Sequence, residues 1–214
     1  MPAPRSRHVP SPGRRRDILE AALACFTARG LHATTMDHIR VRSRASTGSI
    51  YHHFASKEQL AAALYVEALR DYQAGFVAAL APRVSAERGV RAAVAYHIRW
   101  VDRHPDWARY LLDIGRHSEL VAATQADVQA LNQQFRARVE AWMAGPTARR
   151  EITPLPADLY FAIVIGPAHQ FARMWLGGMT QTGIVTAVRT LGAAAWRAVR
   201  VEGGAPGRSP RVRS

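Results

Sequence analysis

The sequence is poor in several kinds of residue and segment, and each scarcity excludes a class of protein. Cys25 is the only cysteine in 214 residues, so an intrachain disulfide and a multi-cysteine zinc site are excluded. No apolar run reaches the ~20 residues that a membrane-spanning helix needs. The N-terminus also lacks the apolar core of a signal peptide. We therefore expect a cytoplasmic protein with no membrane segment.

Signatures of catalysis and of metal binding are also missing. The chain has no Gly-x-Ser-x-Gly elbow, no phosphate-binding loop and no paired carboxylates. Its nine histidines include no i, i+4 histidine pair and no Glu-x-x-His motif. We therefore expect no enzymatic activity, no metal and no cofactor.

Acidic residues are scarce, with 16 against 29 basic residues and a net charge of +13, which favours a polyanionic partner. Residues 1–57 carry +7, residues 58–196 carry +2 and residues 197–214 carry +4. Lys57 is the only lysine, so the arginine excess can reflect a GC-rich coding sequence as well as binding. We expect a flexible basic arm at 1–13 and a flexible basic tail at 202–214. The arm, with Arg14–Arg16 after it, could lie along phosphates or in a minor groove, or could be a solvated tail.

The segment Thr34–Gln59 predicts two short helices joined by a tight turn. Thr34 or Thr35 can cap the first helix, and Ile39 and Val41 supply its apolar side. Ser46 is a second capping residue, so the next helix should run from Thr47 to about Phe54. Two short helices in this arrangement form a helix-turn-helix.

The second of these helices has two chemically different faces. At 100° per residue, one face carries Ile50, His53 and Phe54, where the apolar pair can be buried. The other face carries Gly48, Ser49, Tyr51 and His52. Hydroxyl and imidazole groups can bond base edges and phosphates, and a glycine lets the backbone approach closely. The alternative is a structural module whose polar face meets only water.

The flanking residues complete a three-helix unit over 14–57. An apolar stripe predicts a first helix from about Arg14 to Arg29, ended by Gly30 in a left-handed conformation. Ser56 and Gln59 fit a capping box that starts another helix. Lys57 lies in the first turn of this helix, where a cation interacts unfavourably with the helix dipole. A phosphate partner would explain a lysine at that position.

The motifs ATTMDHI, STGSIYHHF and SKEQL follow an amphipathic first helix in this order, and residues 14–64 resemble the N-terminal domain of TetR-family repressors. In that family the second helix of the motif enters the major groove. The resemblance implies base or phosphate contacts from Thr47, Ser49, Tyr51 and His52, and phosphate contacts from Thr35 and Lys57. Arg44 stands where the family usually has glycine, and Ala45 where valine is common. Arg42 and Arg44 could add phosphate contacts.

The rest of the chain, 58–201, reads as helices separated by breaks, and no alternating strand pattern competes. We predict an all-α protein of about nine helices, with a larger C-terminal domain for ligand binding and dimerisation. Helices are expected from Ser56 to Pro82 and over 85–104, 106–114, 119–143, 157–176 and 183–201, with a loop from Gly145 to Pro156. Gly166-Pro167 should kink the helix that contains it.

Two sets of residues in this domain are candidates for binding. The resemblance implies that the last two helices pair with those of a second subunit; the candidate interface is Phe161, Ile165, Trp175, Ile184, Val188, Leu191 and Ala195. Aromatic and polar residues of the middle helices could line a mostly apolar cavity; the candidates are Tyr96, His97, Trp100, Trp107, Tyr110, Phe135, Trp142 and His169. Both sets could instead be plain core.

The sequence thus favours a homodimeric, sequence-specific DNA-binding regulator. We expect a repressor that a small molecule releases from a palindromic operator, located in the cytoplasm and on the nucleoid when bound to DNA. Two alternatives stay open. One is a helical small-molecule-binding protein or enzyme, and the other is a non-specific architectural DNA-binding protein.

Overall fold

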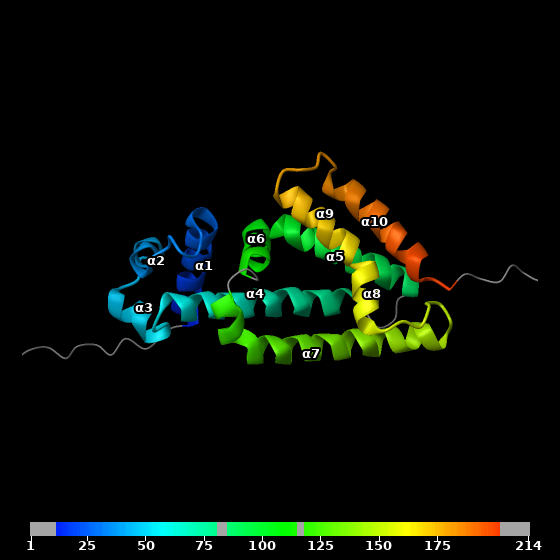
Figure 1. Cartoon of the computed structure of the whole chain (residues 1–214), viewed down its shortest axis with the longest axis horizontal. Coiled ribbons are helices and arrows are strands. Elements are labelled where there is room, and N and C mark those ends of the chain that lie inside the picture. The colour runs from blue at the N-terminus through cyan, green and yellow to red at the C-terminus, as the bar shows by residue number, and fades with distance from the viewer. Residues whose placement is uncertain (1–11, 81–84, 115–117, 202–214) are drawn as a thin grey trace, which may run out of the picture. The chain divides into compact units, whose positions relative to one another are not determined.

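The computed structural model describes residues 12–80, 85–114 and 118–201, which form ten helices (Figure 1). No strand occurs in these segments apart from an isolated bridge between Ile152 and Arg200, so the predicted all-α class is confirmed. The helices are α1 (Pro12–Arg29), α2 (Met36–Ser43), α3 (Thr47–His53), α4 (Lys57–Ala79), α5 (Ala86–Arg103), α6 (Pro105–Ile114), α7 (Ser118–Ala148), α8 (Ala157–Val164), α9 (Gly166–Leu176) and α10 (Ile184–Val199).

Two helix ends differ from the prediction. The single helix expected over 157–176 is two helices, α8 and α9, because Pro167 has no backbone N–H and lies in the first turn of α9. The loop expected from Gly145 begins later, since α7 continues through Pro146 to Ala148. The N–H of Arg149 donates to the Gly145 carbonyl at 3.1 Å, so the helical bonds resume after the proline. The predicted end of the fourth helix at Pro82, the tail, and residues 1–11 of the arm predicted at 1–13 lie outside the described residues. The last two residues of that predicted arm begin α1.

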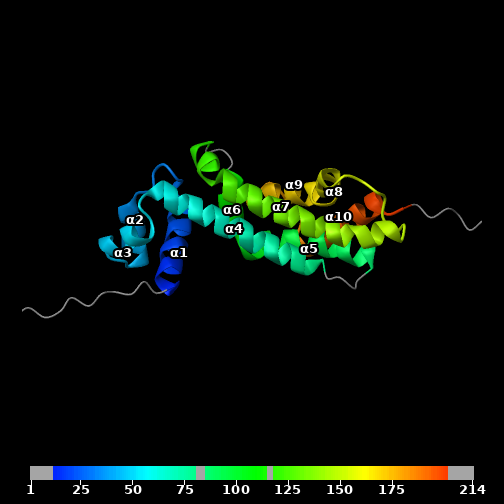
Figure 2. The ribbon, with the colours of Figure 1, turned by 90° about the horizontal axis from the view of Figure 1, so that it is seen from below.

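The chain divides into two compact units, which lie within Met1–Ala74 with Trp100–Gln134 and within Gly75–Arg99 with Phe135–Ser214. In the first unit, α1, α2 and α3 gather at the start of α4 (Figures 1 and 2), and α6 packs against α1. Compactness therefore groups α6 with the N-terminal helices. The functional boundary expected at residue 57 stays a prediction.

The apolar stripe of α1 becomes the core of the first unit. Ile18 and Ala22 are fully buried, and Phe26 is 4% exposed. Gly30 ends α1 with φ 79°, and its N–H donates to the Phe26 carbonyl at 2.8 Å. The predicted left-handed glycine is therefore confirmed, in a conformation that other residues adopt at a cost.

The threonine pair before α2 has two different roles. Thr35 is the N-cap: its Oγ1 accepts from the His38 N–H, and its own N–H donates to His38 Nδ1, both at 3.2 Å. Thr34 is buried, and its hydroxyl bonds the carbonyls of Cys25 and Gly30 at 3.1 and 2.8 Å. Thr34 thus fixes the connection from α1 to α2, and Thr35 starts α2.

The second unit contains the three C-terminal helices, of which α8 and α9 both pack against α10. Its irregular segment is held by Glu151, whose side chain accepts the Ala86 N–H at 3.1 Å and the Arg149 guanidinium N–H at 2.5 Å. The Arg149 side chain and the Ala86 N–H lower the pKa of Glu151. Within the described segments, no helix is both long and apolar enough to cross a bilayer.

Candidate nucleic-acid interface

Helix α3 is held by its cap and by two buried side chains. The Ser46 hydroxyl accepts the Ser49 N–H at 3.2 Å, which confirms the predicted cap. Ile50 is 1% exposed and Phe54, just after the helix, is 4% exposed. Both belong to the core that α1 and α4 build. A helix of this length is marginal by itself, so these contacts hold it in place.

The opposite face of α3 meets solvent. Tyr51 is 50% exposed, Thr47, Gly48 and His52 are exposed, and Ser49 is half-buried. The expected division into a buried apolar face and an outward polar face is therefore present. Whether these residues contact DNA stays a prediction.

Gly48 has no steric role inside the protein. A Cβ built at this position would have no other atom within 4 Å, and φ is not in the left-handed region. A glycine inside a helix costs about 1 kcal/mol relative to alanine. Neither space nor backbone conformation within the chain explains Gly48, and the expected close approach of DNA stays a prediction.

The turn between α2 and α3 is formed by Arg44, which has φ 52° and ψ 29°. This is the left-handed conformation for which glycine is the usual residue. Arg42 and Arg44 are both exposed. They are available for the phosphate contacts expected of them.

Lys57 and Thr35 lie on either side of the motif. The Lys57 Nζ donates to the His32 carbonyl at 3.3 Å. The Lys57 side chain therefore lies next to the segment that precedes α2. The capping box of α4 is present in a modified form: Ser56 Oγ accepts the Gln59 N–H, and Gln59 Oε1 accepts the Ala55 N–H. Thr35 and Lys57, which are expected to contact phosphates, therefore lie at the starts of α2 and α4, and the caps hold both helix starts in place.

Some expectations for the first unit are wrong. Val41 does not belong to the apolar side of α2, since it is 62% exposed. Arg14, Arg15 and Arg16 lie inside α1, where each pairs with a carboxylate. An arm along DNA cannot include them in this form, because α1 continues through all three. Sequence spacing missed the helical start at Pro12, which the preference of proline for a first helical position would have indicated.

Three of the candidate ligand residues belong to the first unit and have structural partners. The Trp100 Nε1 donates to Asp71 at 3.0 Å, and the Tyr110 hydroxyl donates to the Ala61 carbonyl at 2.7 Å. Trp107 is partly buried against the same core as Tyr110. These contacts explain the three aromatics as core residues, and a ligand role for them stays a prediction.

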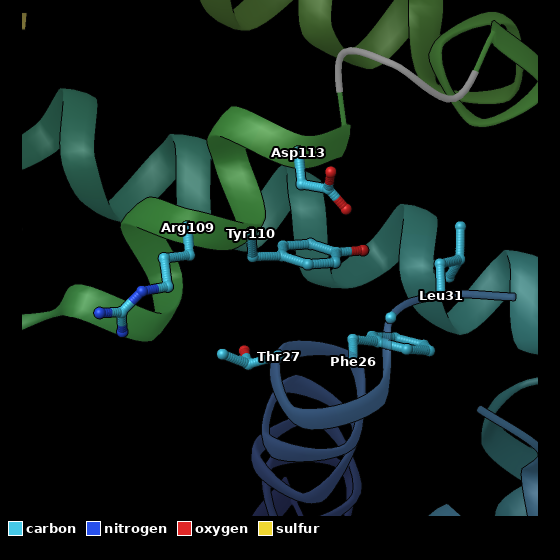
Figure 3. Close-up of a pocket in the computed structure, with 7 residues that line it drawn as sticks. Phe26, Thr27, Leu31, Arg109, Tyr110 and Asp113 are labelled. Atoms are coloured by element: carbon cyan, nitrogen blue, oxygen red, sulfur yellow. The ribbon is translucent and has the colours of Figure 1, made fainter. Parts of the chain in front are cut away.

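A pocket of about 180 Å³ opens between α1 and α6 (Figure 3). Tyr110 stacks on Phe26 with ring centroids 5.8 Å apart. In Figure 3, Asp113 of α6 lies above the Tyr110 ring, and Arg109 of α6 extends to the left, away from the ring. The remaining lining residues are Thr27, Gly30 and Leu31.

The other five ligand candidates lie in the second unit. His97 is buried, and its ring centroid is 5.6 Å from that of His169, which lies on α9. Burial, and secondarily His169, lowers the pKa of His97 to about 4. Burial also lowers the pKa of His169, with a smaller effect of Arg173. Both imidazoles are therefore neutral at pH 7.

The aromatic candidates of this unit pack closely. A Cβ at Gly75 would come within 2.2 Å of the Tyr96 hydroxyl, and one at Gly89 within 2.0 Å of the Trp142 ring. Phe135 contacts Phe161 edge to face, with centroids 6.4 Å apart. Tyr96 and Trp142 thus pack against the backbone of these two glycines. This packing fits the alternative that the sequence left open, in which the aromatics are core residues.

The candidate interface residues divide by exposure. Ile165 and Ala195 are 1% and 5% exposed within the single chain, so including them in an interface was wrong. Both lie in the chain's own core, where a second subunit cannot reach them. Phe161 is exposed, and four candidates are half-buried: Trp175, Ile184, Val188 and Leu191.

Two exposed residues of these helices were missed. Leu159 of α8 is 48% exposed and Val185 of α10 is 83% exposed. Apolar residues cover several faces of both helices, so periodicity could not tell which of them packs inward. A single large apolar side chain on the surface needs no explanation, but with Phe161 these residues make three exposed apolar side chains on α8 and α10.

The fold and the exposed face of α3 define a helical protein with an N-terminal helix-turn-helix. Residues 18–64 match the family described as bacterial regulatory proteins, tetR family. This N-terminal segment therefore resembles that of the TetR family.

Named relatives share mainly the N-terminal segment. The HTH-type transcriptional repressor KstR2 of Mycobacterium tuberculosis is 51% identical over 47 residues, which are 22% of this chain and 24% of that protein. KstR2 of Rhodococcus jostii is 30% identical over 61% of this chain and 62% of its own length. The chain therefore spans about a quarter of the length of the M. tuberculosis protein and under two thirds of the length of the R. jostii protein.

The fold likeness extends further along the chain. The transcriptional regulator FadR from Bacillus subtilis, solved in complex with stearoyl-CoA, aligns with a TM-score of 0.71 at 15% identity and covers 84% of this chain and 96% of its own. At this identity the similarity concerns the fold alone.

Proposed function

We propose that this protein is a homodimeric transcriptional regulator that binds a palindromic operator and responds to a small molecule, most simply as a repressor. One observation carries the proposal: α3 buries Ile50 and directs an exposed polar face, including Tyr51 and His52, toward solvent. Such a helix fits the major groove, whose base edges offer donors, acceptors and methyl groups. In this role the protein works in the cytoplasm and on nucleoid DNA.

The contacts divide into two kinds. Thr47, Ser49, Tyr51 and His52 meet base edges or adjacent phosphates, and Gly48 lets the backbone approach. Thr35, Arg42, Arg44 and Lys57 bind phosphates, which fixes the position of α3 without selecting sequence. The exposure of the four phosphate-binding side chains ranges from half-buried to exposed, which supports this division.

Dimerisation supplies the second half-site. Two recognition helices related by a two-fold axis read half-sites about 34 Å apart. The surface proposed for the partner is that of α8 and α10, where Leu159, Phe161 and Val185 are exposed in the single chain. Val185→Glu should give a monomer by light scattering, whereas the control Val41→Glu, at another exposed valine, should stay dimeric.

The effector site is proposed in the second unit. Phe76, Phe135 and Phe161 form a chain of edge-to-face contacts with centroids 5.2 and 6.4 Å apart. The hydroxyl of Tyr160 on α8 is buried and has no hydrogen-bond partner among the described residues, which is costly unless a ligand satisfies it. An apolar ligand with one polar group fits these features.

The FadR complex suggests a first probe for this site. Stearoyl-CoA should raise the melting temperature and lower operator affinity if the effector is an acyl-CoA, whereas free CoA should do neither. A ligand acts only by binding one state better than the other, with couplings of about 1–3 kcal/mol. A null result with stearoyl-CoA removes this ligand class and leaves the DNA-binding proposal intact.

Selection of bound fragments from random duplex DNA separates the regulator from its two rivals. A regulator should enrich a palindrome, with each mismatch costing about 1–3 kcal/mol. An architectural protein should bind all duplexes alike and release them at moderate salt, and a carrier or enzyme should bind none with preference. A pool without a motif would refute the proposal.

A further inference from the structure

Arg15 of α1 contacts side chains outside its own helix. Its guanidinium forms an ion pair with Glu67 of α4. Its Cζ also lies 5.5 Å from the centroid of the Phe54 ring, which directly follows α3. A single side chain therefore links α1 to both the end of α3 and the middle of α4.

The neighbouring arginines provide the contrast. Arg14 pairs with Asp17 at 3.7 Å and Arg16 with Glu20 at 2.9 Å, within the same helix. Exposed pairs within one helix contribute about 0–1 kcal/mol. The Arg15–Glu67 pair instead joins two helices, through residues 52 positions apart in sequence, and its side chains are 42% and 33% exposed.

Phe54 is the point where this contact reaches the recognition helix. Its backbone N–H donates to the Ile50 carbonyl at 2.8 Å and closes the last turn of α3. Its ring is 4% exposed, with one face toward the planar guanidinium. Arginine stacks on aromatic faces while keeping a carboxylate partner, which lysine does less well.

We propose that Arg15 is a positioning residue for DNA recognition, which holds α3 against α4 through Phe54 and Glu67. The proposal rests on the DNA-binding function proposed above and adds a residue that does not itself contact DNA. The competing role is a phosphate contact by Arg15. The two roles make opposite predictions when Glu67 loses its charge, because a released arginine would bind phosphate at least as well.

The test compares Glu67→Gln with Glu20→Gln in the full-length protein. Both variants remove one negative charge and break one arginine pair on α1, so their effects on general attraction to DNA are matched. The first readout is hydrogen exchange of the α3 amides in the DNA-free protein. The second is the ratio of affinities for the selected operator and for a random duplex, at one salt concentration.

Positioning predicts faster exchange in α3 for Glu67→Gln, with the urea midpoint little changed. It also predicts a fall in the affinity ratio of about fivefold or more, the low end of typical couplings. Glu20→Gln should match the wild type in both readouts. Arg15→Lys, which keeps the charge and loses the planar group, should fall between the two glutamine variants.

Equal exchange and equal affinity ratios in the two glutamine variants would overturn the proposal. Tighter operator binding by Glu67→Gln with unchanged exchange would overturn it in favour of a phosphate contact. If the wild type itself selects no sequence, the proposed function fails, while the exchange measurement still decides whether Arg15 holds α3.

Discussion

The hydroxyl of Tyr110 on α6 donates a 2.7 Å hydrogen bond to the carbonyl oxygen of Ala61 on α4. The ring of Tyr110 also stacks on Phe26 of α1. Burial raises the pKa of Tyr110 far above its usual value, with Asp113 adding to the effect, so the hydroxyl stays a donor at physiological pH. One side chain of α6 therefore contacts both the first helix of the DNA module and the helix that leads out of it.

Tyr110→Phe should lower the free energy of unfolding by about 1 kcal/mol, the net value of a typical hydrogen bond. The loss should not be larger, because a carbonyl inside a helix also accepts the N–H four residues on and the stacked ring is kept. Urea denaturation measures it. Tyr65→Phe removes a hydroxyl from a half-buried ring packed against the same core, and an equal loss there would argue against a specific role for the Ala61 bond.

Gly48→Ala should move stability and DNA binding in opposite directions. The helix should gain up to about 1 kcal/mol from the better helix former, because a Cβ at this position meets no atom of the protein. Operator affinity should fall, because the methyl group would hold the backbone away from the groove. Thermal unfolding and operator titration check the two effects. A variant that is more stable and binds as well as the wild type would show that no partner approaches Gly48.

His97 should make the protein lose stability in acid. Its pKa is about 4 in the folded chain, against about 6.5 for an unperturbed histidine. Between these values the unfolded chain binds a proton that the folded chain does not, so stability falls as pH drops from 6.5 toward 4. At 1.36 kcal/mol per pKa unit, the full loss is roughly 3.4 kcal/mol. Above pH 7 this histidine does not make the free energy of unfolding depend on pH.

Comparison with His97→Gln isolates this contribution, since carboxylates also titrate in the lower part of the window. The free energy of unfolding, measured by urea titration at several pH values, should fall less steeply with acid in the variant. His169, whose pKa is also lowered, acts in the same direction and is present in both proteins. Parallel pH curves for the two proteins would mean that His97 is accessible to protons in the folded state.

Local signals were sufficient to predict most of the helix-turn-helix. The Ser46 cap, the left-handed Gly30 and the buried pair of α3 depend on residues within one or two turns, and sequence spacing records such contacts directly. The family resemblance extends over this same segment. The outward face of α3 was therefore predictable residue by residue.

Contacts between distant segments were not predictable. Nothing near Arg15 indicates that its partner is Glu67 rather than a carboxylate of its own helix. Ile165 and Ala195 read as interface residues, because an apolar stripe looks the same whether the chain or a second subunit covers it. Val41 was misassigned for a similar reason. Helix α2 has only eight residues, which are too few for the spacing of apolar residues to define its buried face.

Arg44→Gly should separate the backbone role of this turn from its charge. A left-handed conformation costs a residue with a side chain about 1–2 kcal/mol, and the greater freedom of glycine in the unfolded chain offsets about 0.5–1 of this. The variant should therefore be more stable by up to about 1 kcal/mol. Its operator affinity should fall at low salt, and the slope of log affinity against log salt should decrease by about one, as expected for a lost phosphate contact.

Arg150→Gly is the matched control, because Arg150 also has a left-handed φ of 56° and lies in the second unit, after α7. It should gain a similar stability and keep the wild-type salt slope. Both variants lose one positive charge, so any difference between their slopes belongs to the position of the charge and not to its sign. If the two slopes decrease equally, Arg44 contributes only to the general attraction of a basic protein for DNA, and the phosphate contact assigned to the turn is wrong.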